Sequence, residues 1–228
     1  MKSTNAKRSP KITNRNFILW FRLAGFAIGV AGVVTSLLAD PMGWLAYSVH
    51  VAAIVTVLFG VLVVKTLCAP KSQKSFGFYP RFSVAAAMLV LVASVGYWGM
   101  LVPFDESGAS IWSHFVFHMF SLHFIIPAFI IFDIVMFNER GRLKKYDPFL
   151  FLIIPLIYMT TFLILGVNQV FEFHFMGMSS YFPYHFLDVD KYGWLVVLSM
   201  LTGTTISSLG MGYGWYWLDK RAARKTMR

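Results

Sequence analysis

The sequence contains few charged residues and almost no cysteine. Only 13% of its 228 residues are charged, and 10 acidic residues stand against 20 basic ones. Because about a quarter of the residues in a soluble globular domain are charged, this composition argues against a soluble fold. The single cysteine, Cys68, excludes an intramolecular disulfide and offers no thiol pair for a metal or redox site.

Long apolar stretches take the place of the missing charges. Hydrophobic residues make up 57% of the chain, and the mean hydropathy is +0.65. A membrane crossing needs roughly 20 apolar residues, and six segments are long enough: 17–39, 43–67, 82–103, 111–137, 148–167 and 193–217. We therefore predict an all-α, polytopic membrane protein, with a six-helix transmembrane domain over 17–217 between basic tails at 1–16 and 218–228.

The positions of the lysines and arginines predict the orientation. All of them except Lys191 fall in the two tails, just inside the first helix, or in the connections at 65–81 and 138–147. Since positive charge is retained on the cytoplasmic side, both termini are expected in the cytoplasm, and the protein in a cell inner or plasma membrane. Basic residues scattered in this way favour anionic lipids as partners and argue against nucleic acid.

Small residues recur at helical spacing in the first and last segments. They are Gly25, Gly29, Gly32 and Ser36 in the first, and Gly203, Ser207, Gly210 and Gly214 in the last. Small side chains let membrane helices approach closely, so both stripes predict helix packing seams.

All six histidines fall in the half of the molecule predicted to be non-cytoplasmic. They are His50, His114, His118, His123, His174 and His185. Polar groups at membrane depth must be paired or face a wet cavity, so these side chains are functional candidates. At about 100° per residue, His114, His118 and Ser121 share one face of the fourth helix, and His123 points roughly 140° away from His118.

A proline follows His123 within one helical turn. Pro127 cannot donate the hydrogen bond that the carbonyl of His123 would normally accept. We therefore expect a kink, an unpaired carbonyl and a cavity beside His123.

Two hydroxyls in the second helix are candidate nucleophiles. A neighbouring imidazole could take a proton from Ser48 or from Thr56, although most such hydroxyls bond back to the preceding turn. With about 1.5 Å of rise per residue, Ser48 is nearest in depth to His118 and Thr56 to His123, but a tilt could shift this by a turn. Four couples therefore stay open.

Three motifs in the second half carry a resemblance to a known family. They are Ser121-Leu-His123-Phe-Ile-Ile-Pro127 followed by Asp133, then Tyr181-Phe-Pro-Tyr184-His185-Phe-Leu-Asp188, and finally Trp217-Leu-Asp219-Lys220. Together they resemble the six-helix androgen-induced and androgen-dependent membrane hydrolases and their bacterial relatives. The architecture matches throughout, and the specific motifs begin near residue 110.

The resemblance implies an intramembrane esterase that cleaves lipids such as fatty acid esters of hydroxy fatty acids. In that family a threonine in the second helix is the nucleophile, and a histidine in the fourth helix assists it. His123 matches the family histidine, and Ser48 stands at the threonine. Ala52 replaces an asparagine that bacterial relatives often carry, and His185 replaces a family proline.

Our leading hypothesis is therefore a lipid ester hydrolase that needs no cofactor. Ser48 would be the nucleophile and His123 the general base, with Thr56 and His118 as the alternative pair. The aromatic loop 171–186 would form an interfacial lid, to which Tyr184, His185 and the following Asp188 contribute substrate contacts. The oxyanion donor would be His118 or His50.

Two other classes of function stay open. His114 and His118, spaced i,i+4, could ligate a metal or haem with ligands from the loop: His174, His185, Glu172 and Asp188. The third class is a non-catalytic lipid transporter or scaffold. The sequence sets no oligomeric state.

Overall fold

Helices account for nearly the whole computed structural model, which describes residues 10–40, 42–70, 72–73, 76–102, 115–175 and 178–224. Six helices in these ranges are long and apolar enough to cross a membrane. This confirms the all-α, six-span prediction. The spans are α1 (Arg15–Ala39), α2 (Tyr47–Cys68), α3 with the π-helix η2 (Pro80–Leu101), α4 to α5 (Phe117–Phe137), α6 with α7 (Asp147–Val167), and α8 (Val189–Arg224).

Short elements complete the fold. A 3₁₀ turn, η1 (Gly43–Leu45), precedes α2, and the π-helix η4 (Ser121–Ile125) joins α4 (Phe117–Phe120) to α5 (Ile126–Phe137). An antiparallel hairpin of β1 (Phe173–Phe175) and β2 (Met178–Ser180) pairs Phe173 with Ser180. The 3₁₀ turn η5 (His185–Leu187) leads into α8.

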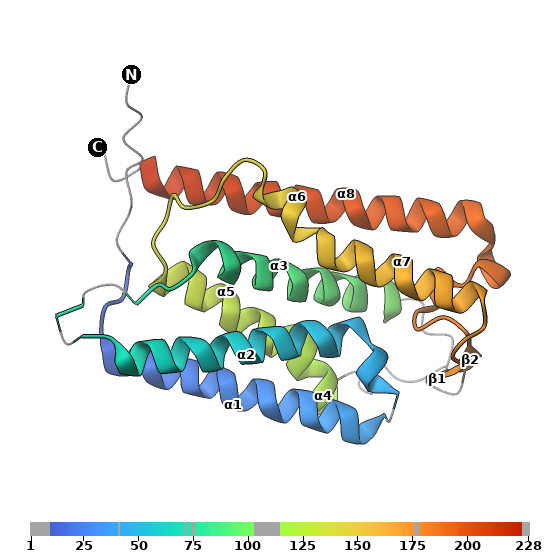
Figure 1. The fold of residues 1–228 in the computed structure, drawn as a ribbon, viewed down its shortest axis with the longest axis horizontal. Coiled ribbons are helices and arrows are strands. Elements are labelled where there is room, and N and C mark those ends of the chain that lie inside the picture. The colour runs from blue at the N-terminus through green and yellow to red at the C-terminus, as the bar shows by residue number, and fades with distance from the viewer. Residues whose placement is uncertain are drawn as a thin grey trace.

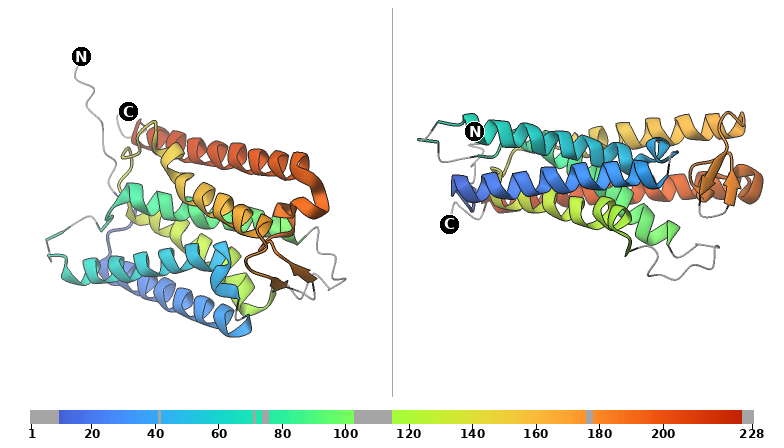
Figure 2. Two further views of the ribbon diagram at one scale, coloured as in Figure 1. Left: turned by 45° about the vertical axis from the view of Figure 1, so that its right-hand side comes forward. Right: turned by 90° about the horizontal axis from the view of Figure 1, so that it is seen from below.

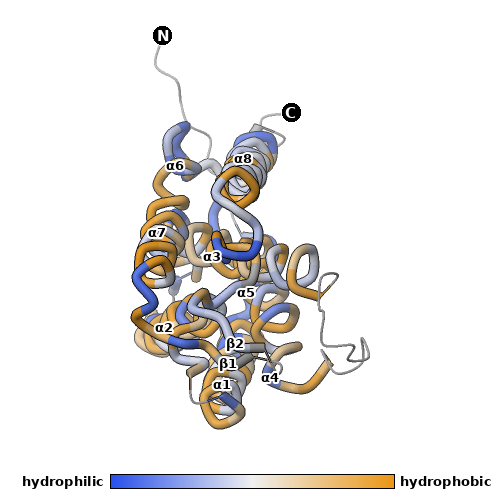
Figure 3. Tube along the Cα trace, turned by 90° about the vertical axis from the view of Figure 1, so that its right-hand side faces the viewer, coloured by the Kyte–Doolittle hydropathy of each residue, from blue (hydrophilic) through white to orange (hydrophobic). Residues whose placement is uncertain are grey.

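The helices run side by side, and the connections gather at two ends (Figure 1). We call the end that holds the β1–β2 hairpin the lid end. The opposite end, where α1 begins and α8 ends, is the terminal end. The described parts of the 69–79 connection and the 138–146 connection lie at the terminal end, and the two further views in Figure 2 keep this arrangement. Figure 3 looks onto the lid end and shows that the helices are predominantly hydrophobic.

The small residues of α1 form the packing seam that the sequence predicts. Gly25, Gly29, Gly32 and Ser36 are all buried. A Cβ atom on Gly29 would overlap the Thr56 side chain, and one on Gly32 would lie 3.0 Å from the Cβ of Ser121. The helices α2 and η4 can therefore approach α1 closely only because these positions lack side chains.

The small residues of α8 contradict the same prediction. Added Cβ atoms on Gly203, Gly210 and Gly214 would have no described atom within 4 Å, because this stripe faces outward. The opposite face makes the contact instead: a Cβ on Gly212 would lie 3.0 Å from Pro148. The spacing of small residues identified a stripe but not the side of the helix that packs.

A buried ion pair joins three helices near the terminal end. Arg22 of α1 donates to Asp133 of α5 through Nε (2.7 Å) and Nη2 (3.2 Å), and its Nη1 donates to Thr66 of α2 (2.8 Å). All three side chains are fully buried. In an apolar interior such charges are tolerated because each is paired and hydrogen-bonded.

The last helix extends past its predicted end at residue 217. It continues to Arg224, and Asp219 accepts hydrogen bonds from the backbone N–H groups of Gly141 (2.8 Å) and Leu143 (3.0 Å). Residues 218–224, which the sequence assigns to a tail, are therefore helical. At its other end the helix is broken at Gly193, where φ is 77°.

Candidate functional site

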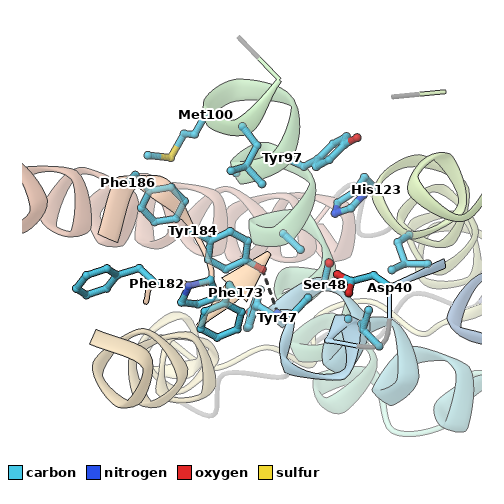
Figure 4. A pocket seen from close by; sticks show the side chains of 18 of the residues that line it. Asp40, Tyr47, Ser48, Tyr97, Met100, His123, Phe173, Phe182, Tyr184 and Phe186 are labelled. Atoms are coloured by element: carbon cyan, nitrogen blue, oxygen red, sulfur yellow. Dashed lines mark hydrogen bonds between the residues drawn. The ribbon is translucent and has the colours of Figure 1, made fainter. Parts of the chain in front are cut away.

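A cavity of about 420 Å³ lies at the lid end and is partly lined by the described residues of 171–186, which we call the lid segment. The first four spans supply most of its wall, and Met159 of α7, the lid segment and α8 supply the rest. Ser48 and His123, which are 75 positions apart in the chain, both line it, and Figure 4 shows both side chains at this cavity. Of the four couples that the sequence leaves open, the two that contain Ser48 are brought to one cavity, because His118 lines it as well.

His123 is held in a form that can accept a proton. Its side chain is 5% exposed, and Nδ1 lies 2.9 Å from the backbone oxygen of Met119. A carbonyl can only accept, so Nδ1 carries the hydrogen and the neutral ring has its lone pair on Nε2. The ring of Tyr97 stacks on the imidazole, with centroids 3.9 Å apart and planes 11° apart. The ring orientation is thus fixed by a hydrogen bond and by stacking.

The carbonyl of His123 is not unpaired, which corrects the prediction made from Pro127. The indole Nε1 of Trp98 donates to it at 3.3 Å. Trp98 belongs to η2 (Tyr97–Leu101), the π-helical end of the third span. A donor from a neighbouring helix therefore replaces the backbone N–H that proline lacks.

The π-helical turn also changes which residues share a face. Predicted 140° apart on an α-helix, His118 and His123 instead line one cavity. The α-helical turn α4 ends at Phe120 and the π-helix η4 follows, so the regular step of about 100° per residue that the prediction assumed does not hold between the two histidines. Ser121, predicted to share the face of His118, is buried against Gly32 of α1.

Ser48 lies in the first turn of α2, beside the hydroxyl of Tyr184. That hydroxyl accepts a hydrogen bond from the backbone N–H of Tyr47 (3.0 Å) and interacts with the backbone and side chain of Ser48. The residue before α2, Ala46, has no side-chain group with which to cap the helix. Tyr184 therefore takes the place of an N-cap residue from a distant segment.

Thr56 and His50 lie away from this cavity. The Thr56 hydroxyl donates to the carbonyl of Ala52 (2.7 Å), and the side chain is wedged against Gly29. His50 is exposed, with its ring 6.1 Å from that of Tyr158. Neither is among the described residues that line the cavity.

The lid segment is fixed by aromatic packing. Tyr184 stacks on Phe186, with centroids 5.3 Å apart, and Phe182 is buried against Gly166 of α7. Both Tyr184 and Phe182 also line the cavity. Beyond the segment, Asp188 accepts from the backbone N–H groups of Asp190 (3.1 Å) and Lys191 (2.9 Å), so it caps the start of α8.

The predicted metal ligands lie largely beyond what the structure describes. His114 is outside the described residues, and so are the side chains of His174 and His185. Among the side chains that are described, no group of three histidine, cysteine, aspartate or glutamate residues could hold a metal ion.

Sequence reasoning missed Tyr97 and Trp98, which hold His123. An aromatic pair near the end of a span is typical of the membrane interface, so its contact with a histidine leaves no distinguishing pattern in the chain.

The chain matches no family model, no curated protein and no solved structure. The resemblance to the androgen-induced and androgen-dependent hydrolases thus stands on its quoted motifs.

Proposed function

We propose that this protein is an intramembrane lipid ester hydrolase in which Ser48 is the nucleophile and His123 the general base. The observation that carries the proposal is that the two side chains line one cavity while His123 keeps its Nε2 free to accept a proton. A hydroxyl beside an oriented imidazole is the usual arrangement for acyl transfer.

The reaction would follow two acyl transfers. Nε2 of His123 takes the Ser48 proton as Oγ attacks the ester carbonyl carbon, and the tetrahedral intermediate collapses with loss of the alcohol, which receives that proton. Water then attacks the acyl-Ser48 ester with the same help from His123, and the carboxylic acid leaves. No cofactor is required.

The cavity wall suits an acyl chain. Aliphatic and aromatic side chains from several spans line it, among them Val92, Leu122, Met159 and Phe173. Such a wall lowers the free energy of a bound hydrocarbon chain by removing it from water. The proposed substrates are lipid esters of the kind implied by the family resemblance, such as fatty acid esters of hydroxy fatty acids.

Lipid membranes would supply these substrates directly. A multi-pass protein contacts membrane lipids, and we propose a cell inner or plasma membrane with both termini in the cytoplasm. In this orientation the cavity lies toward the non-cytoplasmic side, where the lid segment meets the interface.

Kinetics of single and double variants test the proposal. Ser48→Ala removes the atom that is acylated and His123→Ala the proton acceptor, so each should lower ester hydrolysis by at least about 10²-fold. The double variant should lose little more than the worse single variant, because the two groups act as a unit. Thr56→Ala serves as the matched control, with near wild-type turnover. Additive losses, or a wild-type rate in Ser48→Ala, would contradict the assignment.

A further inference from the structure

We propose that the Tyr184 hydroxyl is the oxyanion donor of this site, an assignment that rests on the proposed hydrolase function. Acyl transfer places negative charge on the former carbonyl oxygen, and a pre-placed hydrogen-bond donor stabilises that charge. The sequence suggested His118 or His50 for this task. The structure places a tyrosine hydroxyl beside the nucleophile.

The position of Tyr184 carries the argument. Its hydroxyl lies at the first turn of α2, where it accepts the N–H of Tyr47 at 3.0 Å and interacts with Ser48 (Figure 4). An acyl carbon bonded to Oγ of Ser48 would carry its oxyanion within the same small region. A donor that neighbours the nucleophile can reach that oxygen without any movement of the backbone.

The hydrogen bonds around Tyr184 leave it suited to donate. A phenol has one proton to give, and the N–H of Tyr47 occupies an acceptor position without using that proton. The helix N-terminus, with its positive end of the dipole, polarises the phenolic oxygen. Tyr158 also interacts with this hydroxyl, and because its own proton goes to the carbonyl of Leu45 (2.6 Å), Tyr184 is the donor in that contact and turns its O–H to the oxyanion when the ester is attacked.

The protonation state agrees with a donor role. Burial raises the pKa of Tyr184 to about 12, while its hydrogen bonds with Tyr47, Tyr158 and Ser48 act in the opposite direction. The phenol is therefore protonated at neutral pH and keeps its hydrogen through the reaction. It stabilises the intermediate by a hydrogen bond and exchanges no proton with the substrate.

The two histidines fit the task less well. His50 is exposed and lies outside the cavity lining. His118 lines the cavity, but it comes from α4, in the same span as the general base. The oxyanion forms on the carbon attached to Ser48, which is the side on which Tyr184 lies.

Tyr184→Phe is the direct test, because it keeps the ring and its stacking on Phe186 and removes the donor. We expect kcat to fall by about 10²- to 10³-fold with a smaller change in KM, as for the loss of one oxyanion donor. Tyr181→Phe is the matched control, since Tyr181 lies in the same segment but outside the cavity lining. It should leave kcat within about twofold of wild type, well below the cost of a lost catalytic hydrogen bond.

A fluorinated tyrosine at position 184 separates donation from a structural role. A more acidic phenol loses its proton at lower pH, so the descending limb of the kcat profile should move toward neutrality by the difference in phenol acidity. A purely structural hydroxyl would leave that limb in place. An unmoved limb, or Tyr184→Phe with wild-type kcat, overturns the assignment.

Failure of the underlying function gives a different result. If wild-type protein shows neither ester turnover nor Ser48-dependent phosphonate labelling, the hydrolase proposal fails and the role of Tyr184 with it. If wild type is active and Ser48→Ala inactive while Tyr184→Phe is unchanged, only the role of Tyr184 fails.

Discussion

The indole nitrogen of Trp98 donates to the backbone oxygen of His123 across 3.3 Å, where Pro127 leaves the helix without its own donor. This bond joins the π-helical end of the third span to the π-helical turn of the fourth. His123 in that turn and His118 in the preceding α4 line one cavity. The geometry of the proposed general base therefore depends on a residue that lies 25 positions earlier in the chain.

Trp98→Phe should remove this hydrogen bond while it keeps an aromatic ring at the site. We expect a loss of about 0.5–1.5 kcal/mol in stability, as for one neutral hydrogen bond. Hydrolysis should fall further than that loss explains, because His123 loses its orientation. Thermal unfolding in detergent and kcat measure the two effects. The exposed Trp194, changed to Phe, is the control, and equal effects at both positions would count against the role of Trp98.

Breaking the buried pair between Arg22 and Asp133 should destabilise the bundle. Arg22→Met leaves the carboxylate of Asp133 buried without its partner, at a cost of about 3–5 kcal/mol. The double variant Arg22→Met with Asp133→Leu should recover much of that loss, since no charge is then stranded. Chemical denaturation of the purified protein measures both.

A surface pair provides the comparison. Glu139→Gln removes the partner of the part-exposed Arg142 and should cost no more than about 1 kcal/mol. A similar cost for the buried and surface pairs would show that Arg22 and Asp133 do not stabilise the contact between α1 and α5.

Gly166→Ala should disturb the lid segment. The added Cβ would overlap the ring of Phe182, which is 3% exposed, so ring or helix must move. We expect a destabilisation of about 1–3 kcal/mol, typical of overpacking, together with a higher KM for lipid esters. Gly203→Ala on the outward stripe of α8 has room for its methyl group and should be neutral or slightly stabilising. Equal unfolding temperatures for the two variants would contradict the packing described for Phe182.

The single native thiol can test the orientation. Cys68 is exposed and ends α2 at the terminal end, which we expect in the cytoplasm. A membrane-impermeant maleimide should therefore label Cys68 only after the membrane is permeabilised. Asp190→Cys in a Cys68→Ser background lies at the lid end and should label in intact cells. The reverse pattern would invert the proposed topology.

The spans were predictable because lipid imposes a simple rule of length and apolarity, and their bounds agree with the helices to within a few residues for most of the chain. The packing of α1 was predictable as well, because small residues at helical spacing let membrane helices approach closely. The outward stripe on α8 was not, because spacing alone does not tell which neighbour a face will meet. Arg22 and Asp133 could each be identified in the sequence as charged residues within predicted spans. No local sequence pattern, however, indicates that two residues 111 positions apart form an ion pair.

The candidate site was also predictable only in part. Pro127 correctly predicted a disturbed helix beside His123, but the form of the disturbance depends on Trp98, which belongs to another span. Depth along ideal helices paired Ser48 with His118 and Thr56 with His123. The structure brings both couples that contain Ser48 to one cavity, so the choice of His123 over His118 rests on the orientation of the His123 ring, which the sequence could not predict.

Labelling with a serine-directed lipid phosphonate, followed by mapping of the modified peptide by mass spectrometry, tests the central claim most directly. The account predicts that the phosphonate labels Ser48 in the wild-type protein. Labelling should be absent in Ser48→Ala, much slower in His123→Ala and unchanged in Thr56→Ala. Attachment to Thr56, or labelling that survives Ser48→Ala, would contradict it and place the nucleophile outside the cavity that Ser48 and His123 share.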